Sequence, residues 1–179
     1  VSLFDCDLKG NYQVKNQRTA LAALEILTKK GFKISHTDTQ RGIGSVVSNT
    51  GLLGRWQVLG TLPTLVCDTA HNKEGLLFTT KQLQQINQGV LHIVFGVVGD
   101  KDLEAILPLL PSSARYYFCA PNIPRALNVA ILKQKAIDFS LTGNSFKSVK
   151  AALRAALKAA AINDIIYVGG STFVVAEVV

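Results

Sequence analysis

Residues Gly54–Asn72 read GRWQVLGTLPTLVCDTAHN and contain two strand-like runs separated by a turn signal. Residues 55–59 alternate polar and apolar side chains, a pattern typical of a half-buried strand. Residues 60–63 contain Gly and Pro and predict a turn. The short apolar run 64–67 predicts a second strand, buried on both faces. Together these features predict a β-hairpin that leads into a polar corner.

Three polar side chains, Asp68, His71 and Asn72, follow the second predicted strand. The residues after them predict a helix over 76–86. Ligands of open α/β sheets bind at the carboxyl ends of strands, beside helix N-termini. An acid, an imidazole and an amide in this place therefore predict a binding site. The alternative is local: the acid caps the helix and the imidazole packs through a hydrogen bond.

Strands and helices alternate along the rest of the chain. The predicted strands are 91–96, 115–120, 145–146 and 165–168, and the predicted helices are 103–110, 126–139, 149–161 and 172–179. This alternation predicts an α/β fold with a Rossmann-like, mostly parallel sheet that carries helices on both faces. The hairpin would add one antiparallel edge strand. No G-x-G-x-x-G motif follows the first strand, so the dinucleotide-binding signature is absent.

The N-terminal third of the chain lacks this alternation. Apolar spacing predicts one helix over residues 16–30. Residues 31–53 are polar and rich in turn formers, so they are predicted to be a connector. We place a domain boundary near Asn49, which divides the chain into residues 1–49 and an α/β domain over residues 50–179.

The composition is that of a well-packed globular protein. Hydrophobic residues make up 48% of the 179 residues, and the mean hydropathy is +0.26. These values exclude intrinsic disorder, and no apolar run approaches the roughly 18 residues of a membrane span. Three widely spaced cysteines without metal-binding spacing, and no signal peptide, favour a reducing cytoplasm. The sequence contains no methionine, so we expect a piece of a longer protein.

The formal net charge of +7 raises the question of a nucleic-acid partner. The Lys and Arg residues are scattered, and no basic run is interleaved with aromatic residues, which argues against nucleic-acid binding. A basic surface would also suit small anionic ligands. For most of these residues the alternative is a solvated surface without a specific role.

Several stretches together resemble the C-terminal part of folylpolyglutamate synthase/dihydrofolate synthase, a family of ATP-dependent amide ligases within the Mur ligase superfamily. The resemblance rests on GRWQ and DTAHN in the hairpin region, and on DLKGNYQVKNQRTALAALEIL, GVVGDKD, IPRAL and YVGGSTFVVAEV elsewhere. It spans nearly the whole chain, and the order and spacing of the pieces make it specific. It implies a Mur ligase C-terminal domain over residues 50–179 and the tail of the central ATPase domain over residues 1–49.

The resemblance also implies a reaction. The parent enzyme would use ATP and Mg²⁺ to add L-glutamate to folate or dihydropteroate through an acyl phosphate, a step of folate biosynthesis. Phosphoryl transfer needs positioned phosphates and Mg²⁺, yet the sequence contains no P-loop. We therefore expect the P-loop and the metal ligands in missing N-terminal and central domains, and no activity from this chain alone.

For the nucleotide, the resemblance assigns roles to four residues. Asn16, within the stretch G-x-Y-Q-x-x-N, would lie against the adenine of ATP. Arg55 would reach the phosphates, since its planar fork suits them better than Lys would. Asp68 would accept hydrogen bonds from the ribose hydroxyls, and Asn72 would line the cleft near the phosphates. A helix-terminal amide and an exposed strand residue are the respective alternatives for Asn16 and Arg55.

For catalysis and glutamate, His71 and Ser171 are the main candidates. His71 would line the cleft near the incoming glutamate and, with Arg55, act as a catalytic group. Ser171, in the turn GGST, would help to hold the glutamate. Weaker candidates, whose roles are left open, are Asp100, Lys101 and Arg125.

Two other functions remain open at this point. One is a Mur-type ligase acting on a nucleotide-linked peptide, against which the GRWQ and DTAHN stretches favour the folate enzyme. The other is a nucleotide-binding module without catalysis. A P-loop upstream of this segment in the reading frame would support a ligase and exclude the module.

Overall fold

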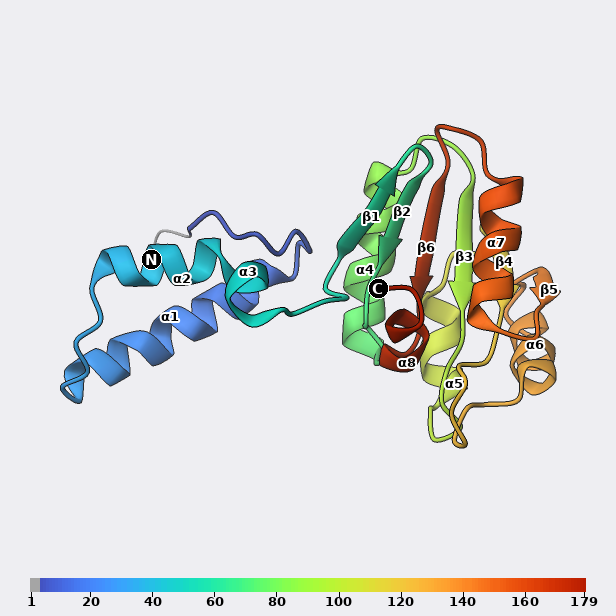
Figure 1. Ribbon diagram of the computed structural model, residues 1–179. Coiled ribbons are helices and arrows are strands. Elements are labelled where there is room, and N and C mark those ends of the chain that lie inside the picture. Colours follow the sequence, from blue (N-terminus) through green and yellow to red (C-terminus); the bar gives the residue numbers. More distant parts are fainter. Residues whose placement is uncertain (1–3) are drawn as a thin grey trace.

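The computed structural model describes residues 4–179, which form a helical lobe and an α/β domain. The helical lobe comprises residues 4–50, and the α/β domain begins at the first strand (Figure 1). Residues 51–56 connect the two and contain Gly51, Gly54 and Trp56, all with positive φ. The predicted division of the chain near Asn49 falls inside a short helix and stays a prediction.

The α/β domain is built on one six-stranded sheet, ordered β1-β2-β6-β3-β4-β5. The strands are β1 (Gln57–Thr61), β2 (Thr64–Cys67), β3 (Leu91–Phe95), β4 (Arg115–Phe118), β5 (Gly143–Ser145) and β6 (Ile165–Gly169). β1 pairs antiparallel with β2 at one edge, and all other pairs are parallel. This confirms the predicted Rossmann-like, mostly parallel sheet with one antiparallel edge strand.

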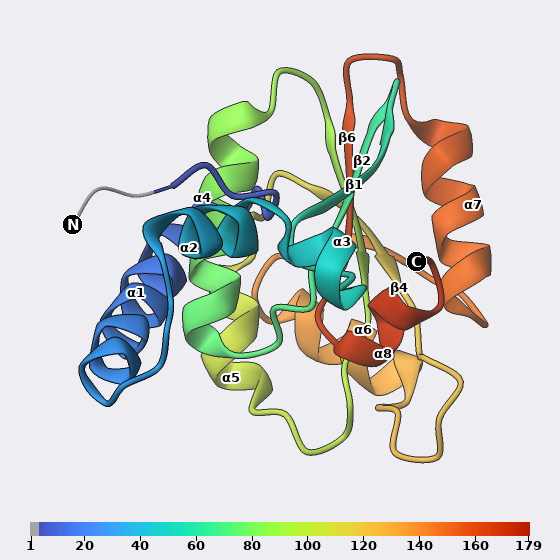
Figure 2. The same cartoon turned by 60° about the vertical axis from the view of Figure 1, so that its left-hand side comes forward.

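Helices cover both faces of this sheet. They are α4 (Lys73–Ile86), α5 (Leu103–Ile106), the 3₁₀ helix η1 (Leu107–Leu109), α6 (Val129–Ile137), α7 (Val149–Ala159) and α8 (Thr172–Ala176). Figure 2 shows α4 and α7 on opposite sides of the strands. Side chains of successive strand residues point to opposite faces, so in β3 Ile93 and Phe95 join the core under α4, α5 and α6. Val94 joins the core under α7 and α8.

Two details of the hairpin differ from the prediction. β1 starts at Gln57 instead of residue 55, because Trp56 has a φ of 48°, in the left-handed region that strands do not use. β2 was predicted to be buried on both faces, but Thr64 and Leu65 are half-buried, and burial is complete only at Val66 and Cys67. The half-buried end of β2 lies next to the hairpin turn.

The amino ends of the parallel strands, at the same end of the sheet as the hairpin turn, are fixed by a buried polar network. His92 of β3 is fully buried, with Nδ1 2.9 Å from the Tyr117 hydroxyl and Nε2 3.2 Å from Asp164 Oδ2. Asp164 also accepts the backbone N–H groups of Val90 and Ala161, each at 2.7 Å. These backbone bonds hold the pKa of Asp164 below its ordinary value. Because its polar groups are paired with one another, this network is structural.

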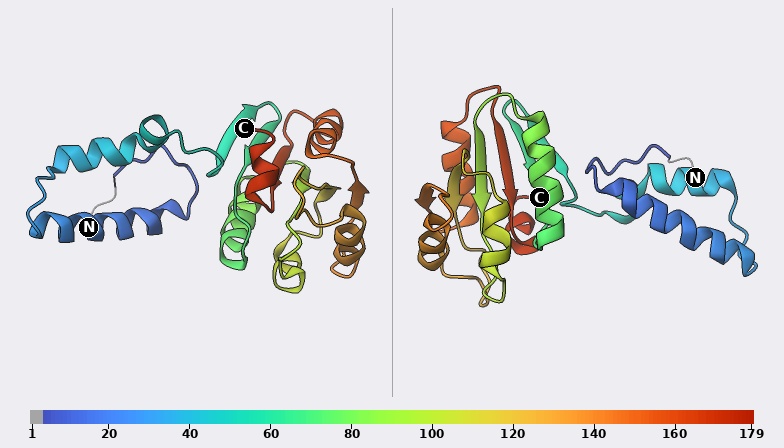
Figure 3. Two further views of the ribbon diagram at one scale, coloured as in Figure 1. Left: turned by 60° about the horizontal axis from the view of Figure 1, so that its bottom comes forward. Right: turned by 180° about the vertical axis from the view of Figure 1, so that it is seen from behind.

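The helical lobe consists of α1 (Gln13–Lys29), α2 (His36–Gly44) and α3 (Val46–Thr50). The predicted first helix is confirmed. Residues 31–53, predicted to be a connector, contain α2 and α3, and the connector role stays a prediction. Figure 3 shows α1 and α2 side by side, away from the sheet. Asp7 accepts the backbone N–H groups of Val46 and Val47 at 3.1 and 2.8 Å and so holds the start of α3.

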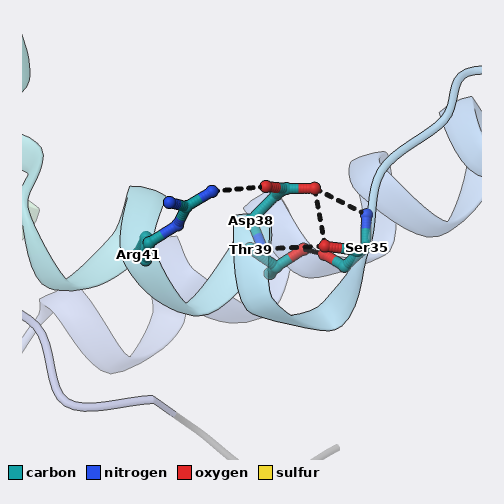
Figure 4. A network of polar contacts seen from close by, with 4 residues as sticks. All are labelled: Ser35, Asp38, Thr39 and Arg41. Atoms are coloured by element: carbon teal, nitrogen blue, oxygen red, sulfur yellow. Dashed lines mark hydrogen bonds and ion pairs between the residues drawn. The ribbon is translucent and has the colours of Figure 1, made fainter.

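A capping box explains why α2 forms. The Ser35 hydroxyl accepts the Asp38 backbone N–H at 3.1 Å, and Asp38 Oδ2 accepts the Ser35 backbone N–H at 3.1 Å (Figure 4). Arg41 adds an ion pair of 2.8 Å to the other oxygen of Asp38. The Ser35 hydroxyl also donates to Asp38 Oδ2 at 2.6 Å, and this bond together with the bond from Arg41 lowers the pKa of Asp38 to about 2. The spacing S-x-x-D was visible in the sequence and signals a helix start.

Candidate functional site

The carboxyl ends of β2, β3, β4 and β6 lie along one edge of the sheet, where the loops after these strands meet. Gly170 has a φ of 92°, and a Cβ there would lie 2.7 Å from the Gly96 carbonyl oxygen. The loop after β6 thus passes close to the loop after β3, an approach that a side chain would block. The turn brings Ser171 to the same edge as His71.

A cavity of about 280 Å³, here called the strand-end pocket, opens at this edge. Its lining comes from the loops after four strands and from the start of α8. The lining residues are His71, Val98, Asp100, Lys101, Arg125, Ser171, Thr172 and Phe173. The structure therefore brings together both residues predicted for glutamate and the three weaker candidates.

Backbone and side-chain contacts fix the shape of the strand-end pocket. Gly99 donates its N–H to the Arg125 carbonyl at 2.9 Å, which joins the loops after β3 and β4. The Arg125 guanidinium lies over the Phe173 ring, 4.9 Å from its centroid. Ser171, which is 3% exposed, caps α8 by accepting the Phe173 backbone N–H at 3.2 Å. Its own O–H proton remains available to a ligand, because a hydroxyl both donates and accepts.

His71 is exposed at the mouth of this pocket, and its tautomer follows from its contact. Nδ1 lies 2.9 Å from the Thr69 carbonyl oxygen, which can only accept. Nδ1 must therefore carry the proton, and in the neutral ring Nε2 is left as the acceptor.

Asp68 lies outside the strand-end pocket and is fully buried. Its Oδ2 accepts the Tyr12 hydroxyl and the Trp56 backbone N–H, both at 2.7 Å, and its Oδ1 accepts the Ala70 backbone N–H at 2.8 Å. Burial raises the pKa of Asp68, and these three hydrogen bonds and the charge of Arg55 oppose that shift. The role of Asp68 toward ribose remains a prediction, since three protein donors already occupy the carboxylate.

Arg55 and His71, the two residues predicted to be catalytic, line different cavities. Arg55 is exposed and lines a second cavity of about 330 Å³ between the helical lobe and the hairpin, here called the interlobe pocket. The other lining residues are Asp7, Leu8, Lys9, Val47, Leu52, Trp56, Gln57 and Val58. Arg55 also lowers the pKa of Asp68 through its charge, so it belongs with Asp68 on the lobe-facing side of the hairpin.

The two predicted amides are exposed and engaged locally. Asn72 is the N-cap of α4, with Oδ1 accepting the Gly75 backbone N–H at 2.8 Å, whereas the local alternative had given the cap to the acid. Asn16 donates from Nδ2 to Gln13 Oε1 at 2.7 Å on the first turns of α1. Their contacts with ATP remain predictions.

Sequence reasoning gave no role to two residues that the structure places at these sites. Tyr12 was part of the quoted G-x-Y-Q-x-x-N stretch, and its contact with Asp68 spans 56 positions, which local spacing cannot reveal. In the sequence, Phe173 is an ordinary apolar residue of a predicted helix. In the structure, the Arg125 guanidinium lies over its ring. Only the resemblance of the GGSTF stretch could have pointed to it.

Metal and membrane features can be stated for residues 4–179. Within that range, no three His, Cys, Asp or Glu side chains gather as a metal site would require. None of the helices there has both the length and the apolar character needed to cross a membrane.

Comparison with known proteins identifies the family of the chain. Residues 54–172 match the family model described as Mur ligase, glutamate ligase domain. The chain therefore belongs to the family of Mur ligase glutamate ligase domains. It is 32% identical over 165 residues to the dihydrofolate synthase/folylpolyglutamate synthase of Escherichia coli, covering 91% of this chain and 36% of that protein.

Solved structures of the same enzymes share the fold. Escherichia coli FolC in complex with DHPP and ADP has a TM-score of 0.79 and 31% identity, covering 91% of this chain and 37% of that one. A bifunctional folylpolyglutamate synthase/dihydrofolate synthase with Mn, AMPPNP and L-glutamate bound has a TM-score of 0.77 and 25% identity, covering 99% and 40%. The chain thus spans little more than a third of the length of these relatives.

Proposed function

We propose that this chain forms one wall of the active site of an ATP-dependent ligase that joins L-glutamate to folate or dihydropteroate. The observation that carries the proposal is the strand-end pocket, where Lys101, Arg125 and the hydroxyl of Ser171 surround a cavity of about 280 Å³. Relatives of the family bind ADP, AMPPNP and L-glutamate, as their names state. The rest of the site would come from a segment that carries a P-loop.

The chemistry explains why ATP is needed. A carboxylate does not react with an amine, because it would have to expel oxide. Transfer of the γ-phosphoryl group to the carboxylate gives an acyl phosphate and ADP. The glutamate amine then attacks the carbonyl carbon, and the tetrahedral intermediate expels phosphate. Positioned phosphates and Mg²⁺ are essential for the first step, so this chain, which has no P-loop, is expected to be inactive alone.

The strand-end pocket suits glutamate in size and charge. Its volume is at the low end of ligand pockets, about 300–1,000 Å³. Arg125 and Lys101 offer cations for the two carboxylates, and Arg is the better fork for a carboxylate. Asp100 offers an anion for the ammonium group. Nε2 of His71, as the acceptor nitrogen, can take a proton from that ammonium so that the amine becomes a nucleophile.

The nucleotide would lie on the other side of the hairpin, along the interlobe pocket. Arg55 would meet the phosphates and Asp68 the ribose, with Asn16 beside the base and Asn72 near the phosphates. This arrangement puts the nucleotide and the amino acid on either side of the residue 68–72 corner.

The three free cysteines support a reducing cytoplasm for the whole protein.

The test uses the protein extended to the length of its relatives. Phosphate release should require ATP, L-glutamate and either dihydropteroate or a folate. His71→Ala and Ser171→Ala should raise the KM for glutamate by roughly ten- to a hundredfold, the size expected when a hydrogen bond to a charged group is lost. His36→Ala, at an exposed histidine of the helical lobe, is the matched control and should leave KM unchanged.

Other outcomes would point to other functions. Activity only with a nucleotide-linked peptide would favour a Mur-type ligase. Nucleotide binding without any glutamate-dependent phosphate release, together with the absence of an upstream P-loop, would favour a nucleotide-binding module. Either result would overturn the folate ligase proposal.

A further inference from the structure

Residues 9–15, which comprise the loop before α1 and its first residues and are here called the start of α1, are bound to the α/β domain by several contacts. Gln82 of α4 accepts the Asn11 backbone N–H at 2.7 Å and donates to the Lys9 carbonyl at 3.2 Å. The ammonium of Lys15 lies 4.5 Å from the centroid of the Phe78 ring. Tyr12 adds a hydrogen bond to Asp68, a residue predicted to bind the nucleotide.

The Tyr12 hydroxyl donates a short hydrogen bond to the Asp68 carboxylate. The distance is 2.7 Å, and Asp68 is 0% exposed. Burial and the Asp68 charge raise the pKa of the Tyr12 hydroxyl above its ordinary value, so the phenol keeps its proton. Hydrogen bonds to charged groups are among the stronger ones in proteins.

The number of acceptor sites on Asp68 limits what else it can bind. A carboxylate offers about four acceptor positions, two on each oxygen. Oδ2 already has two donors, the Tyr12 hydroxyl and the Trp56 N–H, and Oδ1 has one, the Ala70 N–H. A ribose diol has two hydroxyls. For the Asp68 carboxylate to accept one of them on each oxygen, one acceptor position on Oδ2 must be open. One of the two donors on Oδ2 must therefore leave.

Of these two donors, Tyr12 is the one that can move. The Trp56 N–H belongs to a backbone segment held by the bond from the Thr69 N–H to the Gly54 carbonyl at 2.8 Å and by the buried indole of Trp56. Tyr12 is a side chain at the start of the helical lobe. It lies four residues before Asn16, so both side chains are on one face of α1. Tyr12 thus lies between Asn16, the predicted base contact, and Asp68, the predicted ribose contact.

We propose that Tyr12 is a specificity-determining residue for the nucleotide. Its hydroxyl occupies the acceptor position on Asp68 Oδ2 that a ribose diol needs. A nucleotide with both hydroxyls must displace Tyr12, which removes one of the contacts between the start of α1 and the α/β domain. A nucleotide without them leaves the contact intact. This inference rests on the proposed function, because it takes Asp68 to be the ribose-binding residue.

The test compares Tyr12→Phe with the wild type in the protein extended to the length of its relatives. Dissociation constants are measured for ATP and for 2′,3′-dideoxy-ATP, each with Mg²⁺. Removal of the competing hydroxyl should tighten ATP binding by roughly three- to tenfold, the range of one hydrogen bond. The constant for dideoxy-ATP should stay within about twofold. The readout is the ratio of the dideoxy-ATP constant to the ATP constant, which should rise by roughly three- to tenfold.

Gln82→Leu is the matched control, since it removes another contact of the start of α1 and leaves Asp68 with its three donors. Its ratio should equal that of the wild type. If Gln82→Leu changes the ratio as much as Tyr12→Phe does, simple loosening of the lobe explains both, and the competition is refuted.

The remaining outcomes separate the inference from the proposed function. If the wild type prefers ATP over dideoxy-ATP and Tyr12→Phe leaves the ratio unchanged or lowers it, the proposed ribose role stands and the competition is wrong. If the wild type binds the two nucleotides equally or binds neither, the nucleotide role of Asp68 itself fails. The inference then falls with it.

Discussion

The helical lobe and the α/β domain differ sharply in how much apolar side chain they bury. Within residues 4–50, the buried apolar side chains are Leu21 and Ile43, whereas the α/β domain has two clusters that cover both faces of its sheet. Phe32 of the lobe is 59% exposed and Ile26 is 56% exposed. A cavity of about 570 Å³ between α1 and α2 has a largely apolar lining.

This difference shows which part can fold by itself. Most helical stability in proteins comes from packing of an apolar face and little from propensity. The lobe has caps and hydrogen bonds but little to pack on, whereas the α/β domain holds a complete alternation of strands and helices. We infer that the α/β domain is the stable unit and that the lobe depends on contacts it makes elsewhere.

Hydrogen exchange gives the largest contrast between the two parts. Amides of β6, where all five residues are buried, should exchange only through global unfolding, whereas those of α1 should exchange through local opening. We expect protection factors that differ by about a thousandfold or more, since local opening costs far less than the roughly 5–15 kcal/mol of global unfolding. Equal protection of α1 and β6 in a monomer would contradict the comparison.

A pair of leucine substitutions sharpens the contrast. Leu76 of α4 is 0% exposed, and Leu76→Ala should lower the free energy of unfolding of the α/β domain by about 2–5 kcal/mol. Leu21 of α1 is 6% exposed, yet Leu21→Ala should leave the main unfolding transition almost unchanged. Urea unfolding followed through Trp56 fluorescence measures both. Similar losses would show that lobe and domain unfold together.

Much of the α/β domain could be predicted from the sequence because its signals are local. The apolar runs of β3, β4 and β6 are strands buried on both faces, and the Gly- and Pro-bearing turn marks the hairpin. The predictions failed where a helix cap or a long-range effect determines the local structure. α2 depends on the Ser35–Asp38 box rather than on an apolar stripe, and the start of β1 depends on the positive φ of Trp56.

The candidate site was predictable only in part. The residues of the strand-end pocket follow the rule that loops after parallel strands meet at one edge. The contact between Tyr12 and Asp68 joins two parts of the chain 56 positions apart, and nothing in the local sequence indicates that Asp68 is already bonded. The separation of Arg55 from His71 likewise depends on which side of the hairpin each residue faces.

The smallest expected effect concerns the pH dependence at the boundary between the two parts. The pKa of Asp68 is raised by burial, so the folded chain keeps this proton at pH values where the unfolded chain has lost it. The stabilisation is fully present below the unfolded value of about 3.9 and is lost as pH rises through the folded pKa. Asp68→Asn should abolish this part of the pH dependence.

The measurement is urea unfolding of the wild type and Asp68→Asn at several pH values between 4 and 7. The variant loses an acceptor for buried donors, a constant offset of about 1–3 kcal/mol. On top of that offset, the stability of the wild type relative to the variant should fall as pH rises. A difference that stays constant with pH would mean that the folded carboxyl titrates at its ordinary value.

The central claim is that the corner after β2 binds the nucleotide of a glutamate ligase, and Asp68→Ala in the extended protein tests it most directly. Hydrogen bonds to a charged group are worth about 1.5–3 kcal/mol, so kcat/KM for ATP should fall by roughly ten- to more than a hundredfold. The loss for 2′,3′-dideoxy-ATP, which has no ribose hydroxyls, should be much smaller. An equal loss for both nucleotides would contradict the account and leave Asp68 as a structural residue that holds Trp56, Ala70 and Tyr12.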